Sequence, residues 1–288
     1  SGKEHANEEA CPMKIHRIAA FTEDGSGGNP AGVVLADKPL GADIMQRVAA
    51  EVGYSETAFA TPEGDLWATR YFSPEGEVPF CGHATIALGA VLAAEHGAGR
   101  YRLALAGGEI EVDASVEGGL AHATLRSLPT RSEAASAALV EEALTLFGYE
   151  PGSLDASLPP HRMNAGAEHL FVALRSRELL SAMRYELNAG RAFMHRHRLV
   201  TVTFAWREAT DLFHVRNAFA SGGVIEDPAT GAAAAALAGM LRDNGVLTRG
   251  DLIILQGADM GRPSRIAVRF DDPPGSPVLV SGAAAPIT

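Results

Sequence analysis

The feature that most constrains the fold is an uncharged, Ala-rich run at 231–241, directly after the acidic turn EDPATG at 226–231. Ala is the strongest helix former, so the run predicts a helix over 232–242. Because no charged side chain precedes Arg242 in this run, we expect the helix to be buried on all sides. Its first backbone N–H groups then need an acceptor, and a substrate carboxylate is one that a helix start attracts.

Composition excludes several classes of partner. The chain has 288 residues and carries 24 Lys and Arg against 35 Asp and Glu, a net charge of −11, which disfavours binding to nucleic acid or to an anionic membrane. No apolar run approaches the roughly 18 to 20 residues that span a bilayer. Residues 1–12 lack the apolar core of a secretory signal, and we expect them to be a tail or a remnant of expression. Two cysteines, Cys11 and Cys81, offer no disulfide framework, so we expect a cytoplasmic protein.

Periodicity and turn residues predict the other elements. We expect helices at 43–52, 83–95, 137–147, 178–188 and 232–242. We expect strands at 14–21, 31–36, 55–60, 67–72, 168–174, 199–206, 252–256, 265–270 and 278–281, with a meander over 101–126. A change of composition at 128–132 predicts the boundary between an N-terminal domain (13–127, joined by a C-terminal strand at 277–288) and a C-terminal domain (128–276).

The order of these elements repeats. In the first half a strand with Arg70 leads to the segment CGHAT and an uncharged helix, and in the second half a strand with Arg216 leads to DPATG and another uncharged helix. Gly82 then corresponds to Gly231. We therefore expect an α/β (α+β) fold of two similar domains related by a pseudo-twofold axis, each a curved mixed sheet or barrel around a central helix. The two helix N-termini would meet in the cleft between the domains.

Several segments, in the same order, resemble the PhzF-like isomerases of phenazine biosynthesis, which have the diaminopimelate epimerase fold. These segments are the GNP turn at Asn29, SETAF around Glu56, CGHAT at His83, EDPATG at Asp227 and LQGADMGRPS at 255–264. The resemblance implies a cofactor-independent isomerase that moves a proton next to the carboxylate of a small cyclic or amino-acid-like acid. It also implies catalytic roles for Glu56, His83 and Asp227, and a homodimer.

Each of these catalytic candidates has a structural interpretation as well. Glu56 could be a carboxylate at a strand edge, although a partly buried carboxylate suits a base that later acts as an acid. Asp227 precedes Pro228, as an N-cap does when Pro takes the first helical position, and it could also polarise a neighbouring histidine. His83 lies at a predicted helix start, where it could exchange a proton with substrate or be a core histidine.

The expected substrate-binding residues surround the two helix starts: Asn29, Ser55, Gly82, Thr230, Gly231 and Ala232. The family commonly has Ser where this chain has Ala232, so a hydroxyl is lost and the backbone N–H remains to bind a carboxylate. This departure leaves the substrate open. It also keeps open a second class of function, a non-catalytic module for small-molecule binding or protein interaction on the same scaffold.

A third alternative is an amino-acid epimerase or racemase. Two-thiol racemisation needs two facing cysteines, but the position expected opposite Cys81 offers Thr230 and Ala232, and Cys11 belongs to the tail. Cys81 is therefore expected to be a small buried residue. The resemblance implies that no cofactor is needed. No metal is expected either, since the remaining histidines lack the spacing of metal ligands, among them His161, His169, His195 and His197.

Overall fold

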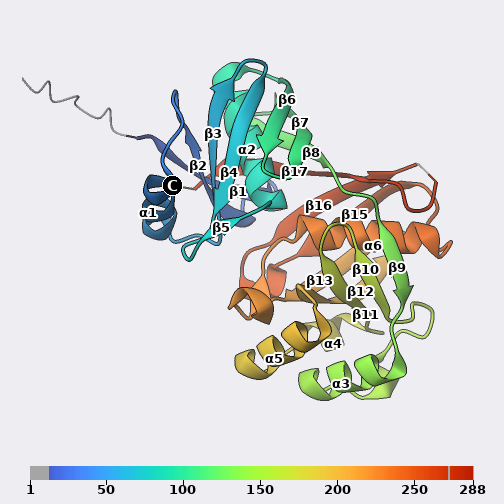
Figure 1. Cartoon of the computed structure of the whole chain (residues 1–288). Helices are drawn as coiled ribbons and strands as arrows, with labels where there is room; N and C mark the ends of the chain where they lie inside the picture. The colour runs from blue at the N-terminus through green and yellow to red at the C-terminus, as the bar shows by residue number, and fades with distance from the viewer. Residues whose placement is uncertain (1–12, 272, 288) are drawn as a thin grey trace, which may run out of the picture.

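The computed structural model describes residues 13–271 and 273–287, and the expected tail at 1–12 lies outside them. Two lobes stand one above the other in Figure 1. The strands of the described residues join in one 17-stranded sheet. Each lobe curls its part of this sheet around one helix, α2 (Gly82–His96) in the upper lobe and α6 (Gly231–Asp243) in the lower. The expected fold of two similar halves with central helices is confirmed.

The elements of the first half are β1 (Ile15–Thr22), β2 (Asn29–Leu35), α1 (Ala42–Val52), β3 (Thr57–Glu63), β4 (Leu66–Phe72), β5 (Glu77–Val78), α2, β6 (Gly99–Leu105), β7 (Gly108–Glu117) and β8 (Leu120–Arg126). Those of the second half are β9 (Arg131–Ala134), α3 (Ala137–Phe147), η1 (Pro151–Ser153), β10 (His161–Asn164), β11 (Glu168–Ala173), α4 (Arg177–Ser181), α5 (Leu187–His197), β12 (Thr201–Ala209), β13 (Leu212–Ala218), η2 (Ala220–Gly222), β14 (Glu226–Asp227), α6, β15 (Gly250–Gln256), η3 (Ala258–Met260), β16 (Ser264–Phe270) and β17 (Leu279–Pro286).

The strand pairing repeats between the halves. From β1 to β8, β1 is antiparallel to β2, β2 is parallel to β3, β3 is antiparallel to β4, and β4 pairs with both β5 and β6 before the β6–β7–β8 meander. The series from β10 to β17 has the same partners in the same directions. In both series the central helix follows the two-residue strand, β5 or β14. The duplication expected from the sequence is therefore present in the topology.

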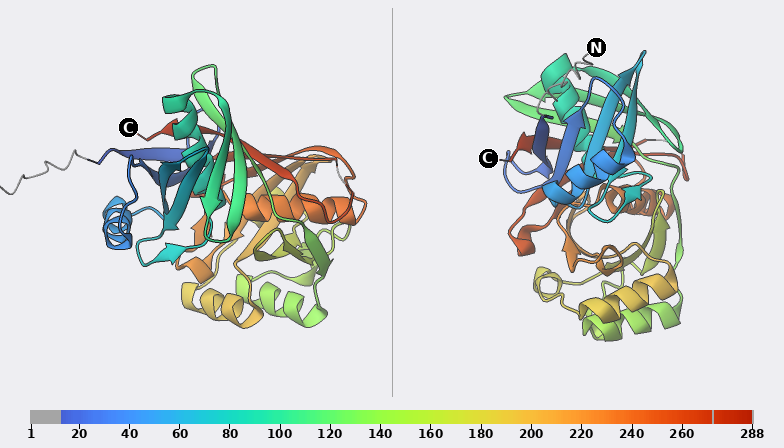
Figure 2. Two further views of the ribbon diagram at one scale, coloured as in Figure 1. Left: turned by 45° about the horizontal axis from the view of Figure 1, so that its top comes forward. Right: turned by 60° about the vertical axis from the view of Figure 1, so that its left-hand side comes forward.

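Strand β17 joins the two halves. It is antiparallel to β16 and also pairs with β1 and β8, which explains why it continues to Pro286, past the expected end at 281. Figure 2 shows this strand passing from the lower lobe into the upper one. We propose the domain division that the sequence indicates, with residues 13–127 and 277–288 in one domain and 128–276 in the other.

Both central helices are enclosed by the sheet. Residues 83–93 of α2 and 233–242 of α6 are buried, as the absence of charge in these runs predicts. Small residues in the helices let the sheet pack closely against them. A Cβ on Gly89 of α2, for example, would lie only 2.9 Å from a side-chain carbon of Val112 on β7. Helices α3 and α5 cover the outer side of the lower lobe, where they pack on strands β11 and β12 in a second core cluster.

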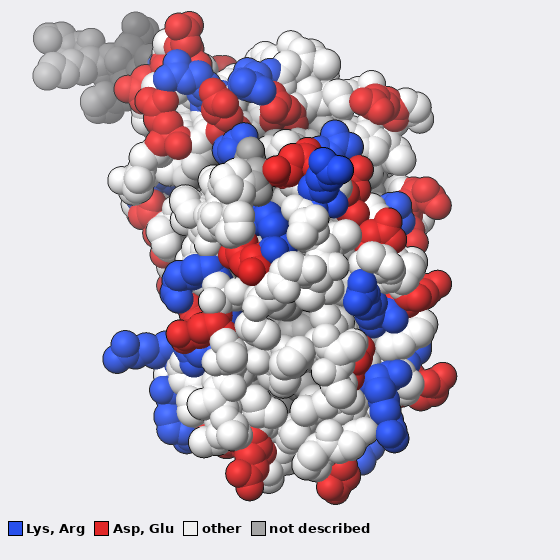
Figure 3. Space-filling model, turned by 90° about the vertical axis from the view of Figure 1, so that its right-hand side faces the viewer, with Lys and Arg blue, Asp and Glu red and all other residues white. Residues whose placement is uncertain are grey.

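The surface carries charges of both signs. On the face drawn in Figure 3, Lys and Arg side chains are interspersed with Asp and Glu side chains. In the described part of the chain, no helix has both the length and the apolar character needed to cross a membrane.

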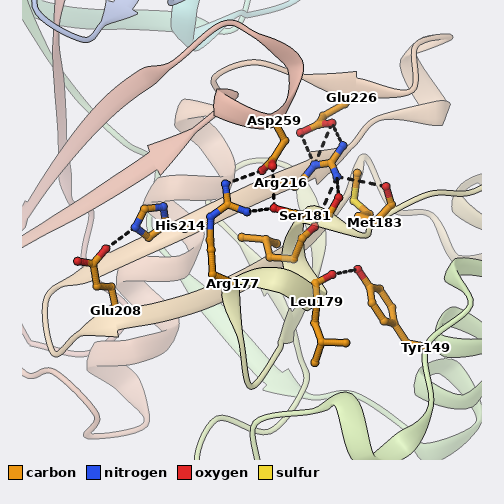
Figure 4. Close-up of polar contacts among 11 residues, drawn as sticks. Tyr149, Arg177, Leu179, Ser181, Met183, Glu208, His214, Arg216, Glu226 and Asp259 are labelled. Atoms are coloured by element: carbon orange, nitrogen blue, oxygen red, sulfur yellow. Dashed lines mark hydrogen bonds and ion pairs between the residues drawn. The ribbon is translucent and has the colours of Figure 1, made fainter.

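The expected helix at 178–188 is wrong. Two shorter helices, α4 and α5, take its place, and the chain between them is not helical. The Nη1 group of Arg216 donates hydrogen bonds to the carbonyl oxygens of Ser181 and Met183, at 2.9 and 3.2 Å, so it captures acceptors that a continuous helix would use (Figure 4). Glu186 then caps α5 by accepting from its first-turn N–H groups.

The glycine turn at 25–28 fixes the start of β2. Gly27 has a φ of 69°, and a Cβ there would lie 2.0 Å from the carbonyl oxygen of Pro263. The N–H of Gly28 donates to the same oxygen at 2.9 Å. The turn therefore closes against the 255–264 segment and presents Asn29, the first residue of β2, to the second half of the chain.

Gly27→Ala is expected to lower the free energy of unfolding by at least about 2 kcal/mol, because a left-handed Ala and an overpacked contact each cost roughly 1–3 kcal/mol. Urea unfolding measures this change. Gly107→Ala is the control, since a Cβ at Gly107 meets nothing within 4 Å. An equal loss in the free energy of unfolding of the two variants would show that the close contact between Gly27 and Pro263 does not affect stability.

Candidate active site

The acidic turn before α6 is held by side chains from both halves. Asn29 on β2 donates through Nδ2 to Oδ1 of Asp227 at 2.9 Å, and the hydroxyl of Thr230 donates to Oδ2 at 2.5 Å. The expected N-cap role of Asp227 is wrong, because α6 begins after Thr230 and Asp227 lies in β14. Its carboxylate is engaged by these partners, and so it is not available to the first N–H groups of the helix.

Gln256, at the end of β15, holds the same turn through hydrogen bonds of its side chain. Its Nε2 donates to the carbonyl oxygen of Asp227 at 2.7 Å and to Oγ1 of Thr230 at 3.1 Å, and its Oε1 accepts from the N–H of Thr230 at 3.3 Å. The side chain is buried. Gln256 is not among the predicted site residues, although it lies within the LQGADMGRPS segment on which the resemblance partly rests.

A second group of polar side chains surrounds His83 at the start of α2. Its Nε2 lies 3.3 Å from Oγ of Ser55 and 3.5 Å from Oε2 of Glu56. Its Nδ1 lies 3.2 Å from Sγ of Cys81. The side chains of His83 and Glu56 are 9% and 18% exposed, so Glu56 is partly buried yet within reach of a ligand.

Ser55 and Glu56 do not belong to a strand, in contrast to the expected strand at 55–60. Strand β3 begins at Thr57, and the carbonyl oxygen of Glu56 accepts a hydrogen bond from the N–H of Gly32 at 3.1 Å. This bond ties the end of the loop to β2, so the loop presents the Glu56 side chain to the histidine.

The electrostatics connect the two groups. Burial raises the pKa of Asp227 to about 6, with His83 acting to lower this pKa and Glu56 to raise it. Burial also raises the pKa of the Cys81 thiol well above its ordinary value, and the nearby carboxylates of Glu56 and Asp227 raise it further. Because Asp227 acts on residues at the start of α2, the structure brings the predicted catalytic residues Glu56, His83 and Asp227 into one site between the halves.

The starts of both central helices border this site. Among the described residues, neither the N-cap Cys81 of α2 nor the N-cap Thr230 of α6 makes a side-chain capping bond. The first intrahelical bonds come from the N–H groups of Thr85 and Ala234, one turn further on. The N–H groups of the first turns therefore offer donors to an anion.

The three small residues expected to bind substrate lie at these helix starts. Gly82 and Ala232 are half-buried, whereas Gly231 is buried against the ring of Phe21. A Cβ on Gly82 would meet no heavy atom within 4 Å, so there is open space beside the first turn of α2. Asn29 and Thr230, also expected to bind substrate, use their side chains to hold Asp227. Their role towards a substrate stays a prediction.

The raised pKa of Asp227 determines how the stability should depend on pH. Burial favours its neutral carboxyl, so between 3.8 and about 6 the folded chain holds a proton that the unfolded chain releases. The free energy of unfolding should therefore fall by up to about 3 kcal/mol as the pH rises through this range. The Asn side chain in Asp227→Asn does not titrate. The free energy of unfolding of this variant, minus that of the wild type, should therefore rise by up to about 3 kcal/mol between about pH 4 and pH 7. Urea unfolding of both proteins at the two pH values tests this, and a difference that is independent of pH would contradict it.

Comparison with known proteins gives the family. The PhzC-PhzF model, described as phenazine biosynthesis-like protein, matches residues 18–288. A trans-2,3-dihydro-3-hydroxyanthranilate isomerase of Pseudomonas chlororaphis is 33% identical over 263 residues, which cover 88% of this chain and 89% of the relative. An uncharacterized isomerase of Deinococcus radiodurans is 32% identical over 274 residues, covering 91% of this chain and 88% of the relative.

Several solved structures have the same fold as this chain. A PhzF-family phenazine biosynthesis protein of Bacillus anthracis superposes with a TM-score of 0.84 at 23% identity and covers 96% of this chain and 97% of its own. A hydroxyproline epimerase of Agrobacterium vitis with bound trans-4-hydroxy-L-proline superposes with a TM-score of 0.61 at 11% identity, over 96% of this chain and 89% of its own. With the family match over nearly the whole chain, this protein belongs to the PhzC-PhzF family of phenazine biosynthesis-like proteins and is a PhzF-type isomerase.

Proposed function

We propose that this isomerase moves a proton between positions next to the carboxylate of a small cyclic or amino-acid-like acid, and that it does so without a cofactor. The observation that carries the proposal is the position of Glu56, a partly buried carboxylate 3.5 Å from the imidazole of His83 at the uncapped start of α2. Its charge also acts on Asp227, which shortly precedes the uncapped start of α6. Support for the substrate class comes from relatives named trans-2,3-dihydro-3-hydroxyanthranilate isomerase, whose named substrate is a cyclic amino acid.

The helix starts supply the binding energy for the acid. Its carboxylate accepts hydrogen bonds from the N–H groups of Gly231 and Ala232, with the open space beside Gly82 receiving the rest of the ring. The net charge of the chain is −11, so this local field, and not the overall charge, attracts the anion. Because Ala232 has no hydroxyl, the backbone alone holds the acid at this position.

Glu56 carries the proton. As a carboxylate it removes a proton from a carbon of the bound acid, and the electron pair of the broken C–H bond shifts into the adjacent unsaturated system. The protonated Glu56 then returns the proton to a different carbon of that system, which leaves an isomer and regenerates the carboxylate. No oxidant, reductant or further reactant is needed.

His83 and Asp227 support this transfer. The Nε2 atom of His83 is close enough to Glu56 and to Ser55 to orient the carboxylate and to stabilise charge on the acid. Asp227, held by Asn29 and Thr230, acts electrostatically on His83 from the opposite half. A ligand that touches both halves favours their closure, which would exclude water from the transferred proton.

Proton NMR in deuterated water tests the proposal directly. The wild-type protein is incubated with a panel of small cyclic and amino-acid-like carboxylic acids that includes trans-2,3-dihydro-3-hydroxyanthranilate. We expect at least one acid to isomerise or to exchange a C–H proton for deuterium next to its carboxylate. Acids that raise the melting temperature without exchange would favour the alternative, a non-catalytic binding module. The Ala at position 232, in place of the family Ser, is the sequence feature that favours this alternative.

Epimerisation is the other possible outcome of this assay. The fold shared with a hydroxyproline epimerase permits it, but Thr230 and Ala232, at the start of α6, carry no thiol to pair with Cys81. Inversion of an amino acid in chiral chromatography, without a shift of a double bond, would replace the proposed isomerisation by epimerisation.

We also infer a homodimer in the cytoplasm. The support is the resemblance for the dimer, and the low cysteine count for a reducing compartment. Sedimentation velocity tests the assembly, with a single species near 60 kDa expected for two chains of 30.1 kDa. A species near the mass of one chain would contradict it.

A further inference from the structure

Glu56, Cys81 and His83 form a compact set of metal-binding donors. One ligand atom from each residue, a carboxylate oxygen, Sγ and an imidazole nitrogen, lies within 4.8 Å of the others. Sγ is 3.2 Å from Nδ1, and Oε2 of the carboxylate is 3.5 Å from Nε2 of the same ring. Donor atoms in a tetrahedral zinc site are roughly 3.3 to 3.7 Å apart, given zinc–donor bonds of about 2.0 to 2.3 Å. These two contacts use different ring nitrogens, so an ion held by one nitrogen requires the third side chain to turn towards it, across a separation of at most 4.8 Å.

The backbone fixes this donor set in advance. Cys81 and His83 lie on either side of Gly82 at the start of α2, a helix that is enclosed by the sheet. Glu56 approaches from the loop before β3, and its side chain keeps some exposure to solvent, which leaves a path for an ion. Two donors from a helix start and one carboxylate from a loop leave a fourth position for water, as in zinc sites with three protein ligands.

The local charge favours a cation. The charged groups that act on the Cys81 thiol are both carboxylates, Glu56 and Asp227. An ion between Glu56 and Cys81 would offset the repulsion that these carboxylates exert on the thiolate form of Cys81. Thiolate, imidazole and carboxylate together are the donor set that Zn²⁺ accepts, whereas Mg²⁺ and Ca²⁺ prefer oxygen ligands alone.

Oxidation chemistry suits Cys81 less well. Burial holds the pKa of this thiol well above its ordinary value, so the group keeps its proton and is a weak nucleophile. A zinc ion changes this balance without a redox partner: the S–H bond breaks, an S–Zn bond forms, and the proton passes to water.

We propose that Glu56, Cys81 and His83 bind one Zn²⁺ ion, and that the bound ion inhibits the enzyme. The ion occupies the carboxylate and the imidazole that the proton shift requires, so it acts as an inhibitor and not as a cofactor. The inhibitory effect rests on the function proposed above. Binding of the ion does not, because it depends only on the donor atoms.

Cobalt, a spectroscopic probe for zinc sites, tests the binding. The full chain with Cys11→Ser, which leaves Cys81 as its one thiol, is titrated with Co²⁺ under reducing conditions. We expect a near-ultraviolet charge-transfer band from thiolate to cobalt, the visible bands of a tetrahedral ion, saturation at one ion per chain, and loss of all bands on addition of Zn²⁺. No charge-transfer band at saturating Co²⁺ would overturn the proposal.

Matched variants locate the ion. Cys81→Ser in the same background should abolish the band, and Cys81→Ala, checked for folding by circular dichroism, should do the same. Glu56→Gln should weaken cobalt binding, while His195→Ala, which alters an exposed histidine at the end of α5, should not. A band that survives the loss of Cys81, or that depends on His195, would overturn the assignment.

Zinc inhibition is measured with any acid that the wild type isomerises. The zinc concentration for half-inhibition should rise by more than about 100-fold in Cys81→Ser, since even indirect partners of a metal ligand change affinity by roughly 10- to 100-fold. Equal inhibition of the wild type and this variant would refute inhibition through this site. If no acid is turned over, the proposed isomerisation fails, and the cobalt spectra still decide whether the metal site exists.

Discussion

Glu56→Gln is expected to lower kcat for the proton shift by roughly 10²- to 10⁴-fold, the range that a positioned general acid–base group contributes. Gln has nearly the same size and can still accept a hydrogen bond, but it cannot take up a proton. Since Glu56 is partly buried and contacts the imidazole of His83 at 3.5 Å, the uncharged variant should keep its fold and bind the acid. The measurement is the initial rate of isomerisation, or of deuterium incorporation, at saturating acid.

A second variant separates chemistry from a general change in charge. Glu51→Gln removes a carboxylate from the exposed side of α1, close in sequence to the site loop. It should leave kcat within about twofold, because an isolated surface charge has little effect at a distance. If Glu56→Gln keeps rates within a few-fold of the wild type, then another group carries the proton and the proposed role of Glu56 is wrong.

Arg216→Ala is expected to lower the free energy of unfolding by about 3 to 5 kcal/mol, the cost of removing one partner of a buried ion pair. Its guanidinium contacts both carboxylate oxygens of Glu226 at 2.6 to 3.2 Å, and the two side chains are only 11% and 4% exposed. Without Arg216, the Glu226 charge stays buried and unpaired. The carbonyl oxygens of Ser181 and Met183 also lose their donor (Figure 4). Urea unfolding measures the loss.

The duplication provides the control. Arg70 on β4 pairs with Glu77 on β5 at 2.6 to 2.7 Å, at the place in the first half that Arg216 and Glu226 hold in the second. These side chains are 40% and 42% exposed, and an exposed pair contributes only about 0 to 1 kcal/mol. Arg70→Ala should therefore cost little. Similar losses in the free energy of unfolding of the two variants would show that burial does not determine how much these ion pairs stabilise the fold.

The central helices and the repeat could be predicted from the sequence because their signals are local. A run of small, uncharged residues long enough for a helix has to be enclosed, and both α2 and α6 are. The order of elements repeats along the chain itself, so the matching topology of the two halves needed no knowledge of which strands pair. The resemblance then pointed to Glu56, His83 and Asp227, whose proximity depends on how the two halves pack.

The errors arise where a distant side chain overrides a local pattern. The sequence Asp227-Pro228 fits an N-cap, but the carboxylate of Asp227 instead accepts from Asn29, 198 residues away. The periodic stretch at 178–188 fits one helix, but Arg216, 35 residues after Ser181, takes the carbonyl oxygen at which that helix would continue. Glu226 belongs to the acidic turn EDPATG and is nevertheless buried, because its partner lies on the adjacent strand. None of these partners can be identified from spacing along the chain.

A crystal structure with an exchange-active acid bound would decide most directly whether the two helix starts and Glu56 form one site. We expect the carboxylate of the ligand within hydrogen-bond distance of the backbone N–H groups of Gly231 and Ala232, and the carbon that exchanges its proton within about 3.5 Å of a Glu56 carboxylate oxygen. A ligand bound away from the start of α6, or with its exchanging carbon beyond the reach of Glu56, would contradict the proposed proton transfer.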